Sequence, residues 1–225
     1  MQDKVGAIVA AAGSSRRMEG VDKTFAPLLG RSLLAHVLGV FQQSHAVHQV
    51  VVVLAEATLA QGKALVADHG FSKVTDVCPG GPRRQDSVYE GLKRLAGCRW
   101  VVIHDGARPC LTTDLIERGL AEAQATGAAI AAVPMKDTLK IVNGAGVIQA
   151  TPARDSLWAA QTPQVFRSDI IAEAYGRQPG DVTDDAALVE ALGYKVKVYM
   201  GSYENIKVTT PQDLALAETI LRNRR

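Results

Sequence analysis

Residues 5–18 read VGAIVAAAGSSRRM, an apolar run that passes into small residues and then into two arginines. An uninterrupted run rich in β-branched residues and alanine is typical of a strand buried on both faces. Four more short runs rich in apolar residues follow, at residues 47–54, 100–103, 128–133 and 196–199. Between the runs, apolar residues recur at helical spacing, as in Leu33, Leu34, Val37, Leu38 and Phe41. Strands that alternate with helices predict an α/β fold with a mostly parallel sheet and helices on both faces.

The overall composition excludes several classes of protein. Hydrophobic residues make up 47% of the 225 residues, and the formal net charge is +2. A charge this close to zero argues against a nucleic-acid binder, and no apolar run is long enough to cross a membrane. The three cysteines, Cys78, Cys98 and Cys110, form no C-x-x-C pair, which fits a reducing cytosol. We therefore expect one cytoplasmic domain over residues 1–225, without a signal peptide.

Residues 137–151 break the strand–helix pattern. Two short apolar stretches flank Asn143-Gly144, a dipeptide typical of a tight turn in a β-hairpin. A two-stranded hairpin is marginally stable alone, so its apolar residues need cover. Two alternatives stay open: the hairpin lies on its own domain, or it is an arm that packs on a second subunit of a symmetric dimer.

The first candidate site follows the first predicted strand. Ala11, Ala12 and Gly13 are small enough to let backbone N–H groups approach a phosphate chain, and Arg17 and Lys23 follow with positive charge. The loop is neither a Walker A motif nor a G-x-G-x-x-G fingerprint. The alternative is an ordinary glycine turn with solvated basic residues.

A carboxylate ends the strand predicted at residues 100–103. Asp105, in the sequence HDGARP, stands where parallel sheets hold ligands. A hard carboxylate beside substrate phosphates suits Mg²⁺. The alternative is an aspartate that only forms a turn with the glycine after it.

Two further segments carry candidate binding residues. In the sequence GGPRRQDSV at residues 80–88, Gly81 allows a ligand to contact the backbone and Ser87 provides a hydroxyl. Lys207 ends an extended stretch, NIKVT, before a helix whose start is predicted by Thr210 as N-cap and Asp213 in a capping box. A lone lysine is more often solvated than catalytic, so Lys207 alone decides little.

Eight motifs occur in one order along nearly the whole chain: AAAGSSRRM, DKTF, GGPRRQDSV, HDGARP, KDTLK, QTPQVF, TDDA and NIKVTxPxDL. As a set they resemble the 2-C-methyl-D-erythritol 4-phosphate cytidylyltransferase family. The resemblance implies a Rossmann-like nucleotidyltransferase fold with a protruding β-hairpin arm at residues 136–155, used for homodimerisation. It also implies Mg²⁺-dependent transfer of CMP from CTP to methylerythritol phosphate, with release of diphosphate, in isoprenoid precursor biosynthesis.

The resemblance also implies roles for residues that match the family's motifs. Arg17 and Lys23 match the pair that grips the CTP phosphates, and Asp105 matches the Mg²⁺ ligand. The nucleotide contacts match Ala11, Ala12, Gly13, Gly81 and Ser87. The acceptor contacts match Thr138, Arg154 and Lys207, of which Thr138 and Arg154 lie on the arm and reach the partner subunit's site.

Three alternatives to this function stay open from the sequence. A sister cytidylyltransferase that uses ribitol 5-phosphate shares the fold and the nucleotide chemistry. A catalytically silent CTP-binding module predicts the loss of Arg17, Lys23, Asp105 or Lys207, and all four are present. A Rossmann dehydrogenase predicts a glycine fingerprint that is missing after the first strand. The chain departs from the family's pattern around Lys23, at Asp22 and Thr24, and again at Pro82.

Overall fold

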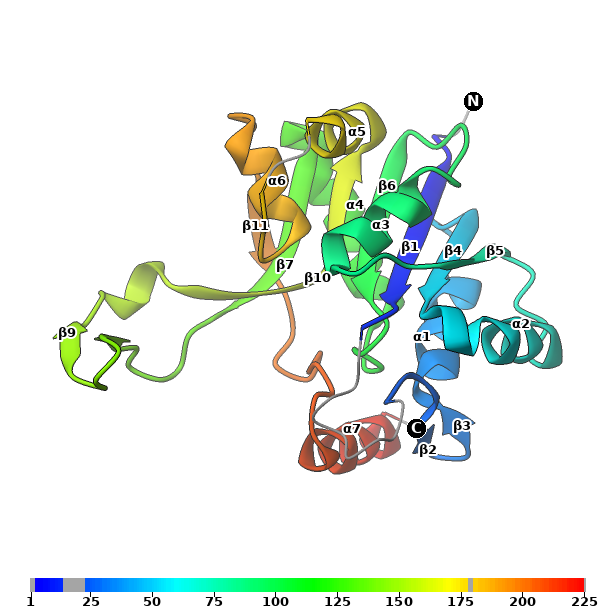
Figure 1. Ribbon diagram of the computed structural model, residues 1–225, viewed down its shortest axis with the longest axis horizontal. Coiled ribbons are helices and arrows are strands. Elements are labelled where there is room, and N and C mark those ends of the chain that lie inside the picture. The colour runs from blue at the N-terminus through cyan, green and yellow to red at the C-terminus, as the bar shows by residue number, and fades with distance from the viewer. Residues whose placement is uncertain (1–2, 14–22, 178–179, 225) are drawn as a thin grey trace.

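The computed structural model describes residues 3–13, 23–177 and 180–224. In this part of the chain a seven-stranded sheet has the order β11–β7–β10–β6–β1–β4–β5 (Figure 1). Its strands are β1 (Val5–Ala11), β4 (Gln49–Leu54), β5 (Val74–Pro79), β6 (Trp100–Asp105), β7 (Ala128–Pro134), β10 (Trp158–Arg167) and β11 (Lys197–Met200). The pairs are parallel except for the two that β10 makes with β6 and β7. The predicted α/β fold with a mostly parallel sheet is confirmed.

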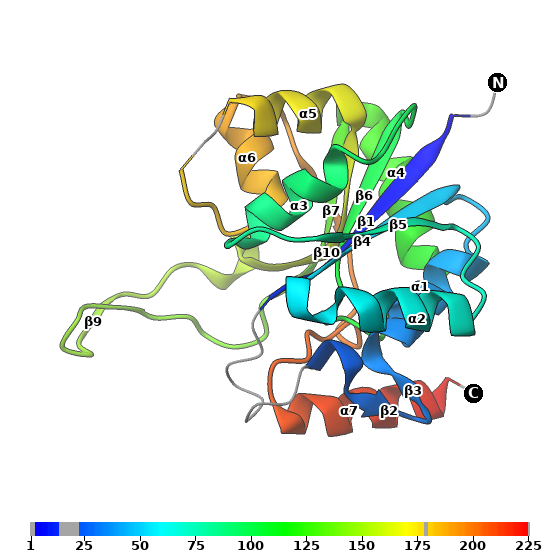
Figure 2. The same cartoon turned by 45° about the vertical axis from the view of Figure 1, so that its right-hand side comes forward.

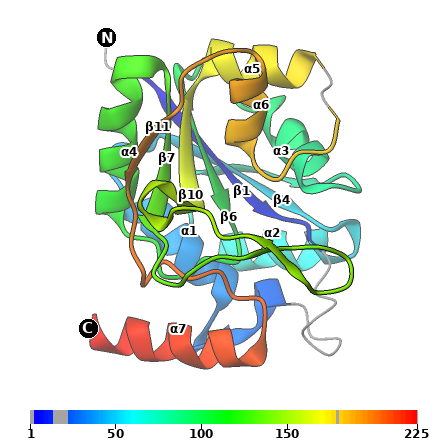
Figure 3. The same ribbon diagram turned by 90° about the vertical axis from the view of Figure 1, so that its left-hand side faces the viewer.

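Helices cover both faces of the sheet (Figures 2 and 3). One face carries α1 (Leu33–Gln43), α2 (Leu59–Asp68) and α4 (Thr113–Thr126), and the other carries α3 (Arg84–Leu92), α5 (Ser168–Gly176) and α6 (Asp185–Ala191). Alternate strand residues enter the two cores: Val9 and Val52 pack in the first, whereas Ile8 and Val53 pack in the second. This alternation explains why the strands read as continuous apolar runs. No described helix is long and apolar enough to span a bilayer.

The last helix, α7 (Pro211–Asn223), packs on the first core through Ala217. It begins as predicted, because the Thr210 hydroxyl accepts from the Asp213 N–H at 3.3 Å and the Asp213 carboxylate accepts from the Thr210 N–H at 2.8 Å. This reciprocal capping box fixes the direction of the extended segment before it. Lys207 lies in that segment.

Several elements were not among the predictions. They are β5, β10, α2, α5, α6, the short pair β2 (Pro27–Leu28) and β3 (Arg31–Ser32), and the 3₁₀ helices η1 (Lys23–Phe25), η2 (Glu56–Thr58) and η3 (Arg154–Ser156). The strand predicted at residues 100–103 extends two residues further, so Asp105 is the last residue of β6. The carboxylate is thereby held by the sheet.

The hairpin of β8 (Ile141–Val142) and β9 (Ile148–Ala150) protrudes from the body (Figure 1). The prediction of a tight turn at Asn143-Gly144 is wrong in detail. The side-chain oxygen of Asn143 accepts from the N–H groups of Ala145 and Val147, each at 3.0 Å, and Gly146 takes the left-handed φ of 77°. The Asn143 side chain therefore organises a longer loop, in which the residue with positive φ is Gly146 and not Gly144.

Candidate active site

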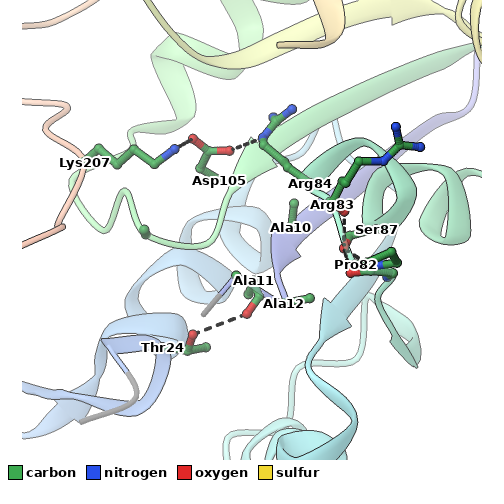
Figure 4. Close-up of a pocket in the computed structure, with 13 residues that line it drawn as sticks. Ala10, Ala11, Ala12, Thr24, Pro82, Arg83, Arg84, Ser87, Asp105 and Lys207 are labelled. Atoms are coloured by element: carbon green, nitrogen blue, oxygen red, sulfur yellow. Dashed lines mark hydrogen bonds and ion pairs between the residues drawn. The ribbon is translucent and has the colours of Figure 1, made fainter. Parts of the chain in front are cut away.

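A cavity of about 480 Å³ opens at the carboxyl ends of the parallel strands (Figure 4). It is lined by Ala10, Ala11, Ala12, Gly13, Thr24, Gly81, Pro82, Arg83, Arg84, Ser87, Asp105, Ala107 and Lys207. The structure thus brings together seven of the predicted residues: Ala11, Ala12, Gly13, Gly81, Ser87, Asp105 and Lys207. Arg17 lies outside the described residues. Lys23 begins η1, next to Thr24, so the roles of Arg17 and Lys23 stay predictions.

The loop at residues 80–83 lets a ligand come close to its backbone. A Cβ on Gly81 would lie 2.4 Å from the Asp86 Cβ, so any larger residue would push the loop from helix α3. The Ser87 hydroxyl donates to the Arg83 carbonyl at 3.1 Å and accepts from the Gly81 N–H at 3.2 Å. Ser87 therefore stabilises the loop through two hydrogen bonds, in addition to lining the cavity.

Asp105 is the centre of a charged cluster (Figure 4). Its Oδ1 accepts from Arg84 Nε at 2.9 Å, and its Oδ2 lies 2.8 Å from Lys207 Nζ and 3.8 Å from Arg108 Nε. Burial alone would raise the pKa of the carboxyl. Arg84, Lys207 and Arg108 outweigh burial and hold that pKa well below its ordinary value. The carboxylate is therefore ionised at neutral pH.

A second cavity, of about 250 Å³, adjoins the first and shares Arg84, Asp105 and Lys207 with it. Arg108 lines only the second cavity, and its side chain is 11% exposed. One guanidinium nitrogen donates to the Asn205 carbonyl at 2.7 Å, whereas Nε has no hydrogen-bond partner among the described residues. A buried cation with an unused donor beside a cavity suits an anionic ligand.

Arg84 and Arg108 were missed as site residues by the sequence predictions. Both belong to motifs that carry predicted site residues, GGPRRQDSV and HDGARP. In those motifs the sequence predicts roles only for the glycine, the serine and the aspartate. The signal that points to Arg108 is its position three residues after a carboxylate that ends a buried strand. For Arg84 the sequence offers no comparable signal.

A buried polar network holds the Asp105 backbone. The Asp105 N–H donates to Thr162 Oγ1 at 3.0 Å, so the Thr162 hydroxyl is left to donate to His104 Nδ1, also at 3.0 Å. His104 Nε2 then donates to the Arg108 carbonyl at 3.2 Å. One fully buried imidazole thus joins β6, β10 and the loop that carries Arg108.

His104 makes stability depend on pH. Burial lowers its pKa from 6.5 to about 4, so between these pH values the unfolded chain binds a proton that the folded protein excludes. Stability is therefore complete above pH 6.5 and falls as the pH drops to 4, by about 3 kcal/mol. Urea unfolding in EDTA should show this slope in the native chain and a shallower one in His104→Gln. Equal slopes would contradict the assignment. The stabilising contribution of the Asp105 carboxylate is complete above its unfolded-state pKa of 3.8 and is lost only below it, so it does not change between pH 4 and 6.5 by a comparable amount.

Thr138 and Arg154 line neither of the two cavities that meet at Asp105; Arg154 instead lines a separate cavity at the base of the arm, with Lys136 and Trp158. Thr138 is exposed at the start of the arm. Arg154 begins η3 on the returning side, where its guanidinium donates to the Lys136 carbonyl at 2.8 Å. Their predicted roles require the cavity of another subunit.

The sequence is similar over nearly its whole length to one protein family. The family model described as "IspD: 2-C-methyl-D-erythritol 4-phosphate cytidylyltransferase" matches residues 5–223. A protein of that name from Dehalococcoides mccartyi (strain CBDB1) is 51% identical over 225 residues, which is 100% of this chain and 99% of its relative. Another from Alkaliphilus oremlandii is 45% identical over 228 residues, covering 99% of this chain and 97% of its relative.

Solved structures agree with the sequence matches. The crystal structure of 4-diphosphocytidyl-2C-methyl-D-erythritol synthase from Anaerococcus prevotii superposes with a TM-score of 0.85 at 30% identity, covering 98% of this chain and 99% of that one. The 2-C-methyl-D-erythritol 4-phosphate cytidylyltransferase from Thermus thermophilus gives 0.79 at 32% identity, covering 99% and 100%. Both similarities extend over the whole sheet and its helices.

Proposed function

The chain belongs to the 2-C-methyl-D-erythritol 4-phosphate cytidylyltransferase family, and from that premise we propose that it transfers CMP from CTP to 2-C-methyl-D-erythritol 4-phosphate. The products are 4-diphosphocytidyl-2-C-methyl-D-erythritol and diphosphate, in isoprenoid precursor biosynthesis. One observation carries the assignment to this site: two cavities meet at Asp105, Arg84 and Lys207. A nucleotide and an anionic acceptor can therefore occupy neighbouring sites on either side of one charged cluster.

The reaction joins two anions, which explains the charges of the cluster. An oxygen of the acceptor phosphate forms a bond to the α-phosphorus of CTP, and the bond from that phosphorus to the β-phosphate oxygen breaks. The acceptor phosphate is already ionised at neutral pH, so no general base is needed. Positioning and electrostatic stabilisation dominate such transfers. Arg84, Arg108 and Lys207 supply fixed positive charge around the point where the two anions meet.

The donor set at Asp105 fits Mg²⁺. Among the described residues no group of three or more His, Cys, Asp or Glu side chains could hold a metal ion alone. Mg²⁺ commonly takes one or two protein carboxylates and completes its shell with water and substrate phosphates. Each Asp105 oxygen accepts one hydrogen bond and keeps lone-pair capacity. A bound Mg²⁺ would neutralise charge on the CTP phosphates, and Asp105 would be its protein ligand.

The arm supports a homodimer. Ile141, Val142, Val147 and Ile148 are 53–60% exposed on the hairpin, and burial of such side chains against a second copy is favourable. In such a dimer Arg154 and Thr138 complete the acceptor site of the partner subunit. The three free cysteines support a cytoplasmic location, which fractionation of cells would check.

Purified protein should release diphosphate from Mg²⁺, CTP and methylerythritol phosphate, and the product mass should be that of the cytidylylated acceptor. Parallel reactions should replace the acceptor with ribitol 5-phosphate, CTP with other nucleoside triphosphates, and Mg²⁺ with EDTA. Turnover only with ribitol 5-phosphate would contradict the proposed acceptor. Full turnover in EDTA would contradict the proposed requirement for Mg²⁺. Folded protein that binds CTP but turns over no acceptor would be a silent binding module.

A further inference from the structure

A buried carboxylate lies behind Arg84, on the side away from Asp105. Asp185, the first residue of α6, has a side chain only 1% exposed. Its Oδ2 accepts from Arg84 Nη1 at 2.8 Å, and its Oδ1 accepts from the Tyr175 hydroxyl at 2.6 Å. Asp185 belongs to the TDDA motif, to which the function proposed above gives no role.

The Asp185 carboxylate is held rigidly from two other helices. Tyr175 of α5 is buried, and its ring stacks on Tyr89 of α3 with centroids 5.6 Å apart and planes 11° apart. Arg84 is the first residue of α3. Both oxygens of Asp185 therefore have fixed donors, and the carboxylate has no freedom to turn elsewhere.

Arg84 connects this buried carboxylate to the reacting site. Its side chain is 28% exposed, and the guanidinium binds Asp185 through Nη1 and Asp105 through Nε. Burial alone would lower the pKa of Arg84, but Asp185 and Asp105 raise it above its ordinary value, so the cation is retained. A continuous line of contacts runs Tyr175–Asp185–Arg84–Asp105–Lys207.

We propose that Asp185 is a positioning residue, which holds the Arg84 guanidinium at the junction of the two cavities whatever Asp105 binds. The proposal rests on the function proposed above. With substrates bound, the Asp105 carboxylate would face their phosphates and would hold the cation, so its bond to Arg84 would not be a constant anchor. The second anchor, at Asp185, is buried and away from the substrates. Without it, Arg84 is free to turn both nitrogens onto Asp105 as a bidentate pair and to occupy the carboxylate that the reaction uses.

The Asp185→Asn variant keeps the shape of the side chain and an acceptor for Tyr175, but removes the charge that holds Arg84. Its kcat should fall by about 10- to 100-fold, because a small misplacement of a charged group in a transferase site costs that much. KM for CTP should change less than kcat, since the backbone loops that line the nucleotide cavity stay in place. Asp185→Glu, which restores the charge, should recover part of kcat. Glu190→Gln, an exposed carboxylate on the same helix, is the matched control and should keep full kcat.

The decisive measurement is a double-mutant cycle with Arg84→Gln. If Asp185 acts through Arg84, then adding Asp185→Asn to Arg84→Gln should change kcat by less than about twofold. Losses that multiply in the double variant would overturn the proposal, as would full kcat in Asp185→Asn alone. Should Asp185→Asn fail to fold, Tyr175→Phe removes only the hydroxyl on Oδ1 and should lose kcat about threefold or more, again only while Arg84 is present.

The two proposals fail in different ways. A native chain that transfers CMP to no acceptor would remove the proposed function and this inference together. A native chain that turns over normally, beside an Asp185→Asn variant with unchanged kcat, would remove this inference alone.

Discussion

Replacing Lys207 with alanine is expected to lower kcat/KM by about 100- to 1,000-fold, the usual cost of removing one preorganised charge from a transfer site. Lys207 Nζ lies 2.8 Å from Asp105 Oδ2, and the side chain lines both cavities. In the proposed function its ammonium would therefore face the point where the nucleotide and acceptor phosphates meet. The extended segment before the capped helix α7 fixes where the side chain starts.

The stability of the protein should change little in Lys207→Ala. The side chain is 41% exposed, and an ion pair with one solvated partner contributes about 1 kcal/mol or less. Asp105 also keeps Arg84 as a partner, so the buried carboxylate is not left alone. Lys195→Ala, at an exposed lysine on the surface, is the control and should be fully active. Steady-state kinetics measure the loss of activity, and thermal unfolding measures stability. Activity of Lys207→Ala within threefold of the native chain would contradict the role proposed for Lys207.

The position of Asp105 and the start of the helix that follows Lys207 could be predicted because both follow from local sequence. A buried apolar run marks β6, and parallel strands end at one edge of the sheet, so the next polar residue lies where ligands bind. Thr210, Pro211 and Asp213 likewise mark the start of α7 and so place the segment before it. These signals act within a few residues and do not depend on the rest of the fold.

Strand β10 could not be predicted for the opposite reason. Its sequence, WAAQTPQVFR, carries the polar residues Gln161, Thr162 and Gln164, all buried, and such residues indicate a loop until their partners are known. Those partners are distant: Thr162 receives the Asp105 N–H, and Gln164 donates to the Asp184 carboxylate at 2.8 Å. Only the folded chain brings them together.

Arg84 illustrates the same limit at a single residue. It follows Arg83 directly, and the two side chains leave the start of α3 in different directions. Arg83 pairs with Asp86 and Asp181 and is 48% exposed, whereas Arg84 pairs with Asp105 and Asp185, 21 and 101 residues away. Adjacent residues of one type differ only in their tertiary partners. The sequence does not show which distant residues those partners are.

If Lys23 and Arg154 have their proposed roles, Lys23→Ala and Arg154→Ala should each lower activity by about 100-fold or more when assayed alone, because each change would remove a cation from the transfer site. If the arm completes the partner's site, an equal mixture of refolded or co-expressed variants should recover activity. Half of the dimers are then mixed, and each mixed dimer has one site with both residues and one site with neither. The recovered activity should be about a quarter of that of the native protein.

The matched control distinguishes cross-subunit assembly from simple stabilisation by mixing. Lys23→Ala mixed with Lys207→Ala should recover nothing, because the second lesion lies in the cavity of its own chain and no dimer then contains an intact site. Arg154 differs from Lys207 in this respect, since it lines neither of the two cavities that meet at Asp105 and starts η3 on the protruding arm. Isolation of the mixed dimers through two different affinity tags confirms that they form. Mixed dimers of the Lys23 and Arg154 variants that stay inactive would place Arg154 outside the partner's site and remove the catalytic reason for the arm.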